Sequence, residues 1–475
     1  MVKIEIMVSL AIYMAGMLYI GYWSYKKTSD LSDYMLGGRG LGPAVTALSA
    51  GASDMSGWML MGLPGAMYAT GLSSVWIAIG LLIGAYANYL IIAPRLRTYT
   101  EVANDSITIP DFLENRFKDR TKILRFVSAI VILVFFTFYA SAGLVSGGRL
   151  FENSFNLDYK IGLFVTVGVV VAYTLFGGFL AVSWTDFVQG CIMFIALVLV
   201  PIVAFTDVGG VTETFNTIKQ VDASHLDMFK GTTILGIISF LAWGLGYFGQ
   251  PHIIVRFMAI TSIKDLKTSR RIGIAYYAKN NATLQDPEMV FVTFSNILFH
   301  PYITGFLLSA ILASIMSSIS SQLLVISSAV TEDFYKTFFR RNASDKELVF
   351  IGRLSVLVVA MIAVVLAYHP SDTILTLVGY AWAGFGSAFG PAILLSLYWK
   401  RTNKWGVLAG MIVGAVVVIA WVKILSLKAI MYEMVPGFFC SLLTVIVVSL
   451  LTKEPVKAVH REFNEMEAIL EEETK

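Results

Sequence analysis

Charge is the property that this sequence most lacks. Only 14% of its 475 residues are charged, whereas a soluble globular protein carries about 25%. Hydrophobic residues make up 57% of the chain, and the mean hydropathy is +0.73. We therefore expect lipid, rather than water, to surround most of the surface. The formal net charge is only +3, so no broad basic surface for nucleic acid is expected.

Several chemical signatures are absent as well. The two cysteines, Cys191 and Cys440, lie in separate apolar runs and provide neither a disulfide framework nor a metal site. No G-x-x-x-x-G-K-[ST] motif occurs, and the glycines of 37–40 follow no strand pattern, which excludes the common nucleotide-binding loops. His252 and His300 are isolated, without metal-ligand spacing. Nothing indicates an enzyme, an organic cofactor or an obligatory protein partner.

Long apolar runs are what the chain has instead. A membrane-spanning helix needs about 20 mostly apolar residues. Twelve runs meet that test, near residues 4–25, 41–68, 73–94, 123–148, 160–180, 187–206, 233–256, 302–328, 349–368, 372–398, 406–424 and 432–451. The first is too long for a signal-peptide core and has no clear cleavage site, so it is expected to be a retained helix. The charged tail, 453–475, is expected to be a cytoplasmic, loosely ordered helix or an irregular tail.

Lysine and arginine in short loops predict the orientation, since these loops stay in the cytoplasm. Lys26, Lys27 and Arg39 follow the first run, which places the N-terminus outside. Two further groups of basic residues are then predicted to lie on the cytoplasmic side. The first is Arg95, Arg97, Arg116, Lys118, Arg120 and Lys122, and the second is Arg256, Lys264, Lys267, Arg270 and Arg271. Up to this point the pattern is consistent.

The pattern fails after Arg271. Lys336 and the basic residues that follow it also require the cytoplasm, yet only one full-length run, 302–328, lies between. The stretch Ile274–Glu288 is too polar for lipid, and Met289–Phe299 is too short to cross, although it could form a surface or re-entrant helix. We therefore expect that one spanning helix is missing after Gly273.

An acid stands in the middle of a spanning run, in the motif LSAGASDMSGW at 48–58. A charge at membrane depth is expensive and marks an ion or proton path, and Asp54 is such a charge. Neighbouring glycines, with Pro64 behind them, allow the helix to unwind. The alternative is a structural acid paired within the bundle.

A second interrupted run is WGLGYFGQPH at 243–252. Two Gly/Pro-broken helices, one in each half of a chain, indicate a transporter binding site. The alternative for the aromatic residues is packing and anchoring at the membrane interface.

Two further polar features accompany these breaks. Ser314, Ser317, Ser318 and Ser321 share one helix face, which suits either close packing or an oxygen-lined wall for a hard cation. Asp186 stands at an expected helix start, where it could serve as an N-terminal cap.

These motifs, together with YTLFGGFLAVSWTD at 173–186, resemble the sodium/solute symporters, and within that family the bacterial sodium/proline symporters. The resemblance covers about residues 5–452. It implies an all-α, leucine-transporter-like fold of two inverted five-helix repeats, here with one repeat helix missing after Gly273. The expected parts are an extra helix and loop (1–40), a first repeat (41–206), a second repeat (207–400), two further helices (401–452) and the tail (453–475).

The resemblance also implies site residues. Sodium would be bound by main-chain oxygens of Ala52, Met55 and Ser314 and by the hydroxyls of Ser317 and Ser318, the last being commonly threonine in the family. Asp54 and Asp186 match acids linked to sodium. Proline would be bound by Ser56, Trp58, Tyr139, Trp243, Tyr247, Gln250 and Pro251.

The expected function is import of L-proline, coupled to sodium, by alternating access through a bacterial cytoplasmic membrane. The ligands implied are proline, sodium and the lipid bilayer. Three alternatives stay open: a symporter of another small organic solute, a channel or sensor, and a relative whose transport is impaired by the missing helix. Uptake measurements with several solutes would test for a different solute. Ion flux without solute accumulation would indicate a channel or sensor. Rescue of uptake by a restored helix would indicate a transport-impaired relative.

Overall fold

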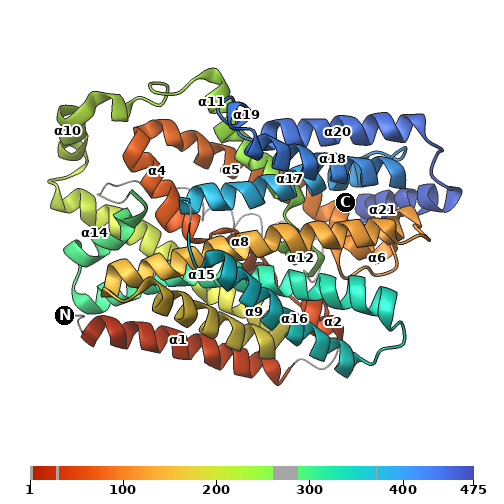
Figure 1. Cartoon of the computed structure of the whole chain (residues 1–475), viewed down its shortest axis with the longest axis horizontal. Coiled ribbons are helices and arrows are strands. Elements are labelled where there is room, and N and C mark those ends of the chain that lie inside the picture. Colours follow the sequence, from red (N-terminus) through yellow and green to blue (C-terminus); the bar gives the residue numbers. More distant parts are fainter. Residues whose placement is uncertain (1–3, 28–30, 260–286, 371, 475) are drawn as a thin grey trace.

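The computed structural model describes residues 4–27, 31–259, 287–370 and 372–474, and this part of the chain contains helices and no strands. The helices lie side by side along the long axis of the molecule (Figure 1). The expected all-α fold is confirmed. The position of the expected missing helix, after Gly273, lies outside the described residues.

The first half of the chain holds α1 (Ile4–Tyr25), α2 (Leu31–Leu36), η1 (Gly37–Arg39), α3 (Pro43–Asp54), η2 (Trp58–Gly62), α4 (Leu63–Thr70), η3 (Gly71–Ser74), α5 (Val75–Ala87), η4 (Asn88–Ile92), α6 (Ala93–Val102), α7 (Ile109–Phe117), α8 (Ile123–Phe155) and α9 (Tyr159–Asp207). Six of the twelve predicted runs lie in this half, and each coincides with helical structure.

The second half holds α10 (Val211–Asp222), η5 (Ala223–Leu226), α11 (Ile234–Leu241), η6 (Ala242–Gly249), α12 (Pro251–Ala259), η7 (Pro287–Met289), α14 (Val290–Leu298), α15 (Pro301–Ser328), η8 (Ala329–Phe339), α16 (Asp345–Ala367), α17 (Ile374–Tyr398), α18 (Lys404–Lys423), α19 (Leu425–Lys428), α20 (Met434–Leu451) and α21 (Lys457–Thr474). Within the described residues, nine helical stretches are long and apolar enough to cross a membrane, and a pair bent by 44° at Gln250 adds a tenth. The chain is therefore a multi-pass membrane protein.

Helix α9 differs from the sequence prediction, which placed two helices at 160–180 and 187–206 with a connection between them. The break lies earlier, at Gly178, where the backbone adopts φ 57° and ψ −150°. A side chain there would collide with the ring of Tyr34, 2.6 Å from a Cβ atom. Helical structure then continues through Asp186, so the predicted connection is wrong.

Burial distinguishes the centre of the bundle from its edge. In the most apolar window of α15 and η8, 89% of the residues are buried, against 28% for α1. Figure 1 shows α1 along one edge and α18 with α20 along the opposite one. Helix α15, which carries the serine face, therefore lies where several other helices can meet it.

Two helices approach closely through glycine. A methyl group at Gly84 of α5 would lie 2.2 Å from the carbonyl oxygen of Gly244 in η6, and one at Gly244 would lie 2.2 Å from that of Gly80. Only hydrogen fits at such positions, so glycine allows the two backbones to touch.

The tail forms the ordered helix α21 rather than a loose one. The ring of Phe463 is buried and lies edge-on to Tyr99 of α6, with ring centroids 6.0 Å apart. Lys118 and Glu462 form an ion pair at 2.5 Å. Apolar burial and ion pairing therefore hold the tail against α6 and the end of α7.

Candidate substrate and ion site

The first helix break separates α3 from η2. Helix α3 ends at Asp54, and Met55 has non-helical angles of φ −77° and ψ 79°. The indole nitrogen of Trp58 donates to the Asp54 carbonyl oxygen at 3.0 Å, which replaces a lost helical hydrogen bond. A Cβ atom at Gly57 would lie 2.4 Å from the Ser146 hydroxyl, so glycine lets this break approach α8. The interruption expected from the sequence is confirmed.

The second break lies between η6 and α12. Gln250 has extended angles, φ −86° and ψ 103°, and Pro251 begins the next helix. The amide nitrogen of Gln250 donates to the carbonyl oxygen of Trp382 at 3.1 Å, which ties the break to α17. A Cβ atom at Gly246 would lie 2.1 Å from the Trp382 indole nitrogen, so this segment also depends on glycine.

The serine face of α15 contacts the first break. The Ser317 hydroxyl donates to the Ala52 carbonyl oxygen at 2.7 Å and to that of Ser314 at 3.1 Å. The Ser318 hydroxyl donates to the next carbonyl, that of Ser53, at 2.9 Å. These residues are all fully or almost fully buried. Carbonyl and hydroxyl oxygens are the ligands that hard cations prefer, so their chemistry fits sodium.

Of the five residues expected around sodium, the structure therefore brings Ala52, Ser314 and Ser317 into direct contact. The Ser318 hydroxyl instead contacts the carbonyl oxygen of Ser53, the residue that follows Ala52. Met55 is the buried residue at which the helix breaks.

Asp54 joins the two breaks. Its side chain is fully buried, and the Tyr247 hydroxyl of η6 donates a short hydrogen bond to the Oδ2 atom. Within the described residues the Oδ1 atom has no hydrogen-bond partner. One carboxylate oxygen is thus held by the second broken helix while the other is free for a ligand.

Aromatic rings form the wall beside this pair. The Trp58 and Trp243 rings lie 6.1 Å apart, and Trp243 stacks on Tyr432 at 5.3 Å with an interplanar angle of 13°. Trp382 lies over Trp243 at 6.5 Å, and its indole nitrogen donates to the Trp243 carbonyl oxygen at 2.8 Å. Trp382 and Tyr432 were not predicted, although Trp382 stands in a glycine-rich spanning run that could have indicated it.

The other residues expected around proline lie nearby. The Tyr139 ring of α8 is buried and lies 5.9 Å from the His252 ring, which follows Pro251. Ser56 is buried at the first break, where its hydroxyl accepts from the Trp58 backbone at 3.5 Å. Pro251 lines a separate cavity on the other side of the second break.

Asp186 lies in the interior of α9, away from any helix start, so the N-terminal cap alternative is wrong. Its Oδ2 atom accepts hydrogen bonds from Ser49 at 2.8 Å and from Arg256 at 3.1 Å. Arg256 also donates to Ser321 at 2.6 Å. Arg256, which the sequence groups with basic residues on the cytoplasmic side, lies within α12, and its side chain is only 1% exposed. An opposite charge makes this burial tolerable for both residues.

A membrane bundle in which two broken helices meet at a buried polar site is the architecture of a secondary transporter. A family model described as the sodium:solute symporter family matches residues 34–279 and 275–414. The chain is 65% identical to the osmoregulated proline transporter OpuE of Bacillus subtilis, over 98% of this chain and 99% of the relative. It is 64% identical to the high-affinity proline transporter PutP of the same organism, over 94% of this chain and 98% of the relative. The chain belongs to the sodium:solute symporter family.

Solved structures agree on the fold. A Na⁺-coupled sialic acid symporter matches with a TM-score of 0.80 at 19% identity, over 95% of this chain and 99% of that one. Mhp1, a nucleobase-cation-symport-1 family transporter, matches with a TM-score of 0.54 at 14% identity, over 92% and 98%. These likenesses concern the fold alone, and they bear out the leucine-transporter-like arrangement.

The comparisons also bear on the expected missing helix. The alignment with OpuE spans 487 positions, more than the 475 residues of this chain, so the relative has residues that this chain lacks. The family model matches in two segments that meet at residues 275–279. The first finding does not locate these residues, and the second divides the family match close to Gly273.

Proposed function

We propose that this protein imports L-proline together with sodium by alternating access, with its N-terminus outside and α21 in the cytoplasm. The printed names of relatives that are 64–65% identical over nearly the whole chain support proline as the solute. Sodium coupling is supported by the family and by a relative named sodium/proline symporter in Staphylococcus aureus, which is 52% identical. A bacterial cytoplasmic membrane is the corresponding location.

The observation that carries the proposal is the contact between the α15 serines and the broken end of α3. Ser317 and Ser318 reach carbonyl oxygens of Ala52 and Ser53 at 2.7 and 2.9 Å. In our proposal sodium is coordinated by these same hydroxyl and carbonyl oxygens, and the hydroxyls keep their protons but turn them away from the ion. The full ligand set proposed is Ala52, Met55, Ser314, Ser317 and Ser318.

Proline would lie on the aromatic side of the two breaks. Its apolar ring and secondary ammonium suit the faces of Trp58 and Trp243, and its carboxylate suits hydroxyls and helix N-termini. The proposed contacts are Ser56, Trp58, Tyr139, Trp243, Tyr247, Gln250 and Pro251.

Coupling would pass through the hydrogen bond between Tyr247 and Asp54. Sodium beside α3 fixes Asp54, and Asp54 then fixes the Tyr247 ring on the proline side. Linkage requires that each ligand tightens the binding of the other by the same factor. Zwitterionic proline has no net charge, so each sodium carries one charge inward, to which the membrane potential contributes about 2.3 kcal/mol per 100 mV.

Uptake of labelled proline into vesicles, with and without an inward sodium gradient, tests the proposal. We expect labelled proline to accumulate to a level that depends on the sodium gradient. Unlabelled proline should compete with this uptake more strongly than pantothenate or sugars do. Proline uptake that stays constant across a sodium titration would contradict symport. Ion flux without solute accumulation would indicate a channel or sensor.

A second candidate function is that of a transport-impaired symporter. The observation that favours it is the longer alignment with OpuE together with the family match that divides at residues 275–279. Insertion of an apolar segment of about 20 residues after Gly273 tests it. Raised uptake after insertion would support impairment, and uptake already at the level of the relatives before insertion would reject it.

A further inference from the structure

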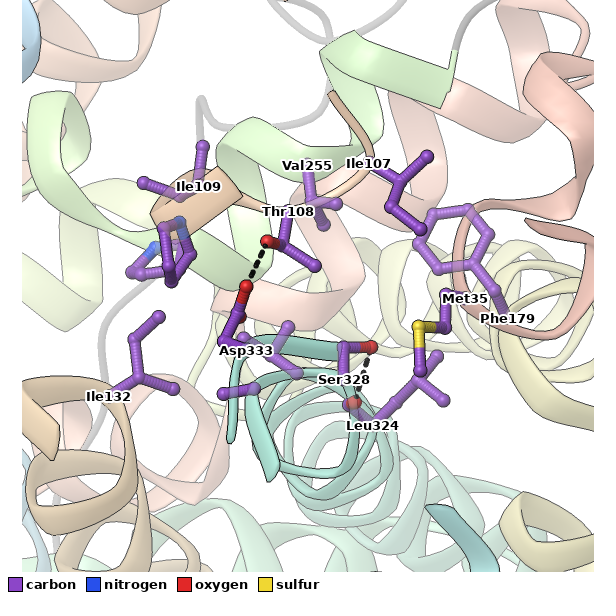
Figure 2. A pocket seen from close by; sticks show the side chains of 14 residues that line it. Met35, Ile107, Thr108, Ile109, Ile132, Phe179, Val255, Leu324, Ser328 and Asp333 are labelled. Carbon is purple, nitrogen blue, oxygen red and sulfur yellow. Dashed lines mark hydrogen bonds between the residues drawn. The ribbon is translucent and has the colours of Figure 1, made fainter. Parts of the chain in front are cut away.

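The space on the two sides of the second break is filled differently. On one side a cavity lies between α7, α12, α15 and η8 (Figure 2). On the other side three aromatic rings contact the ring of Trp243, and they belong to Trp58, Trp382 and Tyr432. Trp58 and Trp382 lie in the two expected repeats. Tyr432 lies just before α20, in the part of the chain that follows them, so the repeats alone do not account for this ring.

Tyr432 is held in place by two hydrogen bonds besides its stacking contact. Its backbone N–H donates to the hydroxyl oxygen of Ser239 in α11 at 3.0 Å. Its own hydroxyl donates to the carbonyl oxygen of Gly379 in α17 at 2.8 Å. The residue is thus fixed at its backbone and at its hydroxyl, and its ring lies against that of Trp243 with centroids 5.3 Å apart and an interplanar angle of 13°.

The sequence spacing brings these partners together. Ser239 precedes Trp243 by four residues, so both lie on one face where α11 continues into η6. At Gly379 a Cβ atom would lie 3.4 Å from the Trp243 ring and 3.8 Å from the Tyr432 ring. Both rings therefore lie over the same glycine of α17, and Tyr432 connects α11 to α17 across the indole.

The stack limits the freedom of the Trp243 side chain. Stacked aromatic rings attract one another beyond the area that they bury. A side chain that is already ordered loses less conformational entropy when a ligand binds. Trp243 is one of the residues proposed to contact the ring of proline, so a neighbour that orders its indole raises the affinity for the solute.

We propose that Tyr432 is a positioning residue for proline, which holds the Trp243 indole in the orientation that receives the ring of the solute. The inference rests on the proposed function and gives the C-terminal helices a part in solute affinity. The proposed sodium ligands lie at the end of α3 and on α15 instead. Loss of Tyr432 therefore weakens proline binding and leaves sodium binding unchanged.

Proline titration of uptake in proteoliposomes tests this role. Tyr432→Leu should raise the proline concentration for half-maximal uptake by about tenfold and leave the maximal rate within about twofold, because a ring contact and a hydrogen bond are lost. Tyr432→Phe keeps the ring and should stay within about threefold. Tyr380→Leu is the matched control and should stay within about twofold. Tyr380 follows Gly379 on α17, but its hydroxyl accepts a hydrogen bond from Lys428.

Direct binding separates the solute from the ion. Binding of ²²Na⁺ to purified Tyr432→Leu in the absence of proline should stay within about twofold of the unmodified protein, since the two sites share no ligand. Sodium binding that weakens as much as proline binding would overturn the proposal.

The position of the indole can be tested without transport by ¹⁹F NMR of the full chain labelled with 5-fluorotryptophan. The spectrum of Trp243→Phe identifies the Trp243 resonance among those of nine tryptophans. Tyr432→Leu should shift that resonance, because a stacked ring no longer lies over the indole. Tyr432→Phe and Tyr380→Leu should leave it in place. An unshifted Trp243 resonance in Tyr432→Leu would overturn the proposal.

The kinetic result distinguishes positioning from folding. A lower maximal rate with an unchanged half-saturation in Tyr432→Leu, or equal effects of Tyr432→Leu and Tyr380→Leu, would overturn the proposal. If Tyr432→Leu does not fold, Tyr432→His, which keeps a smaller aromatic ring, should raise the half-saturation by about threefold. Absence of sodium-dependent proline uptake in the unmodified protein would reject the proposed function, while the NMR measurement would still decide whether Tyr432 positions Trp243.

Discussion

Asp54 and Asp186 are both acids buried in spanning helices, but their surroundings differ. Asp186 receives hydrogen bonds from Ser49 and Arg256 and shares an ion pair with the latter. Asp54 receives one side-chain hydrogen bond, from Tyr247. The Oδ1 atom of each acid has no hydrogen-bond partner within the described residues, so the difference between them lies in the paired arginine. No basic side chain contacts Asp54 in that part of the chain. The charge of Asp186 is therefore neutralised by the protein, whereas that of Asp54 awaits a ligand.

Both acids stay predicted to be linked to sodium, and this difference is the basis for testing whether Asp186 acts mainly through its ion pair and Asp54 mainly through coupling. A paired carboxylate stabilises the position of α9 against α3 and α12 whether or not an ion is present. An unpaired one gains most when a cation arrives, because burial strengthens the attraction. The following experiments are ordered by the size of the expected effect.

Arg256→Gln should have the largest effect on folded stability. It leaves Asp186 as an uncompensated buried charge, which costs about 3–5 kcal/mol. Thermal unfolding in detergent measures the loss. Arg256→Gln/Asp186→Asn should recover part of it, since no unpaired charge then remains. If the double variant is no more stable than the single one, the ion pair does not hold this region together.

Asp54→Asn should leave thermal unfolding unchanged or slightly improved but impair coupling. We expect the sodium concentration for half-maximal uptake to rise by about 100-fold, which corresponds to about 2.8 kcal/mol. Uptake at a series of sodium concentrations measures this. A variant that loses stability without losing sodium dependence would assign Asp54 the structural role instead.

Tyr247→Phe removes the hydrogen bond that joins the two breaks. A hydrogen bond to a charged group contributes about 1.5–3 kcal/mol, so sodium half-saturation should rise by about tenfold. In the Asp54→Asn background the same change should have little further effect, because the two residues act as a pair. Additive losses in the double variant would show that Tyr247 acts on proline alone.

Substitutions of Ser318 should have the smallest effect on sodium dependence, and they allow a hydroxyl to be removed or kept at one position. Ser318→Ala removes one hydroxyl and should weaken sodium dependence by about fivefold, as expected for about 1 kcal/mol. Ser318→Thr keeps the hydroxyl and should stay within about twofold. Sodium titration of uptake measures both. If the two variants are equally impaired, the volume of the side chain, rather than its hydroxyl oxygen, determines the sodium dependence at this position.

Much of the fold could be predicted from the sequence because lipid imposes a simple length and composition rule. The twelve runs coincide with helices, and both breaks lie where glycine and proline indicated them. The sequence predicts the break in α9 too late, because the polar Thr-Asp pair at 185–186 is typical of a connection between helices, whereas the break lies at Gly178. Tertiary pairing of Asp186 with Arg256 made that polarity tolerable inside a helix.

The candidate site was predictable only in part. Residues within one motif, such as Asp54 and Trp58, follow from local sequence. Contacts across the bundle do not, because they depend on which helices pack together. The stacking of Trp243 on Tyr432 joins residues far apart in the chain, and the contact of Ser318 with Ser53 joins α15 to α3. The role of Arg256 was missed since a basic residue near a helix end resembles a loop residue.

The glycine contact between α5 and η6 has a consequence for the geometry of the transport cycle. Because Gly84 and Gly244 leave no space for a side chain between the two backbones, we expect these segments to move together. A pair of spin labels placed in the first turns of α5 and α11 should therefore report a constant separation throughout turnover. The distance between these labels would serve as a fixed reference for measuring any displacement of α15.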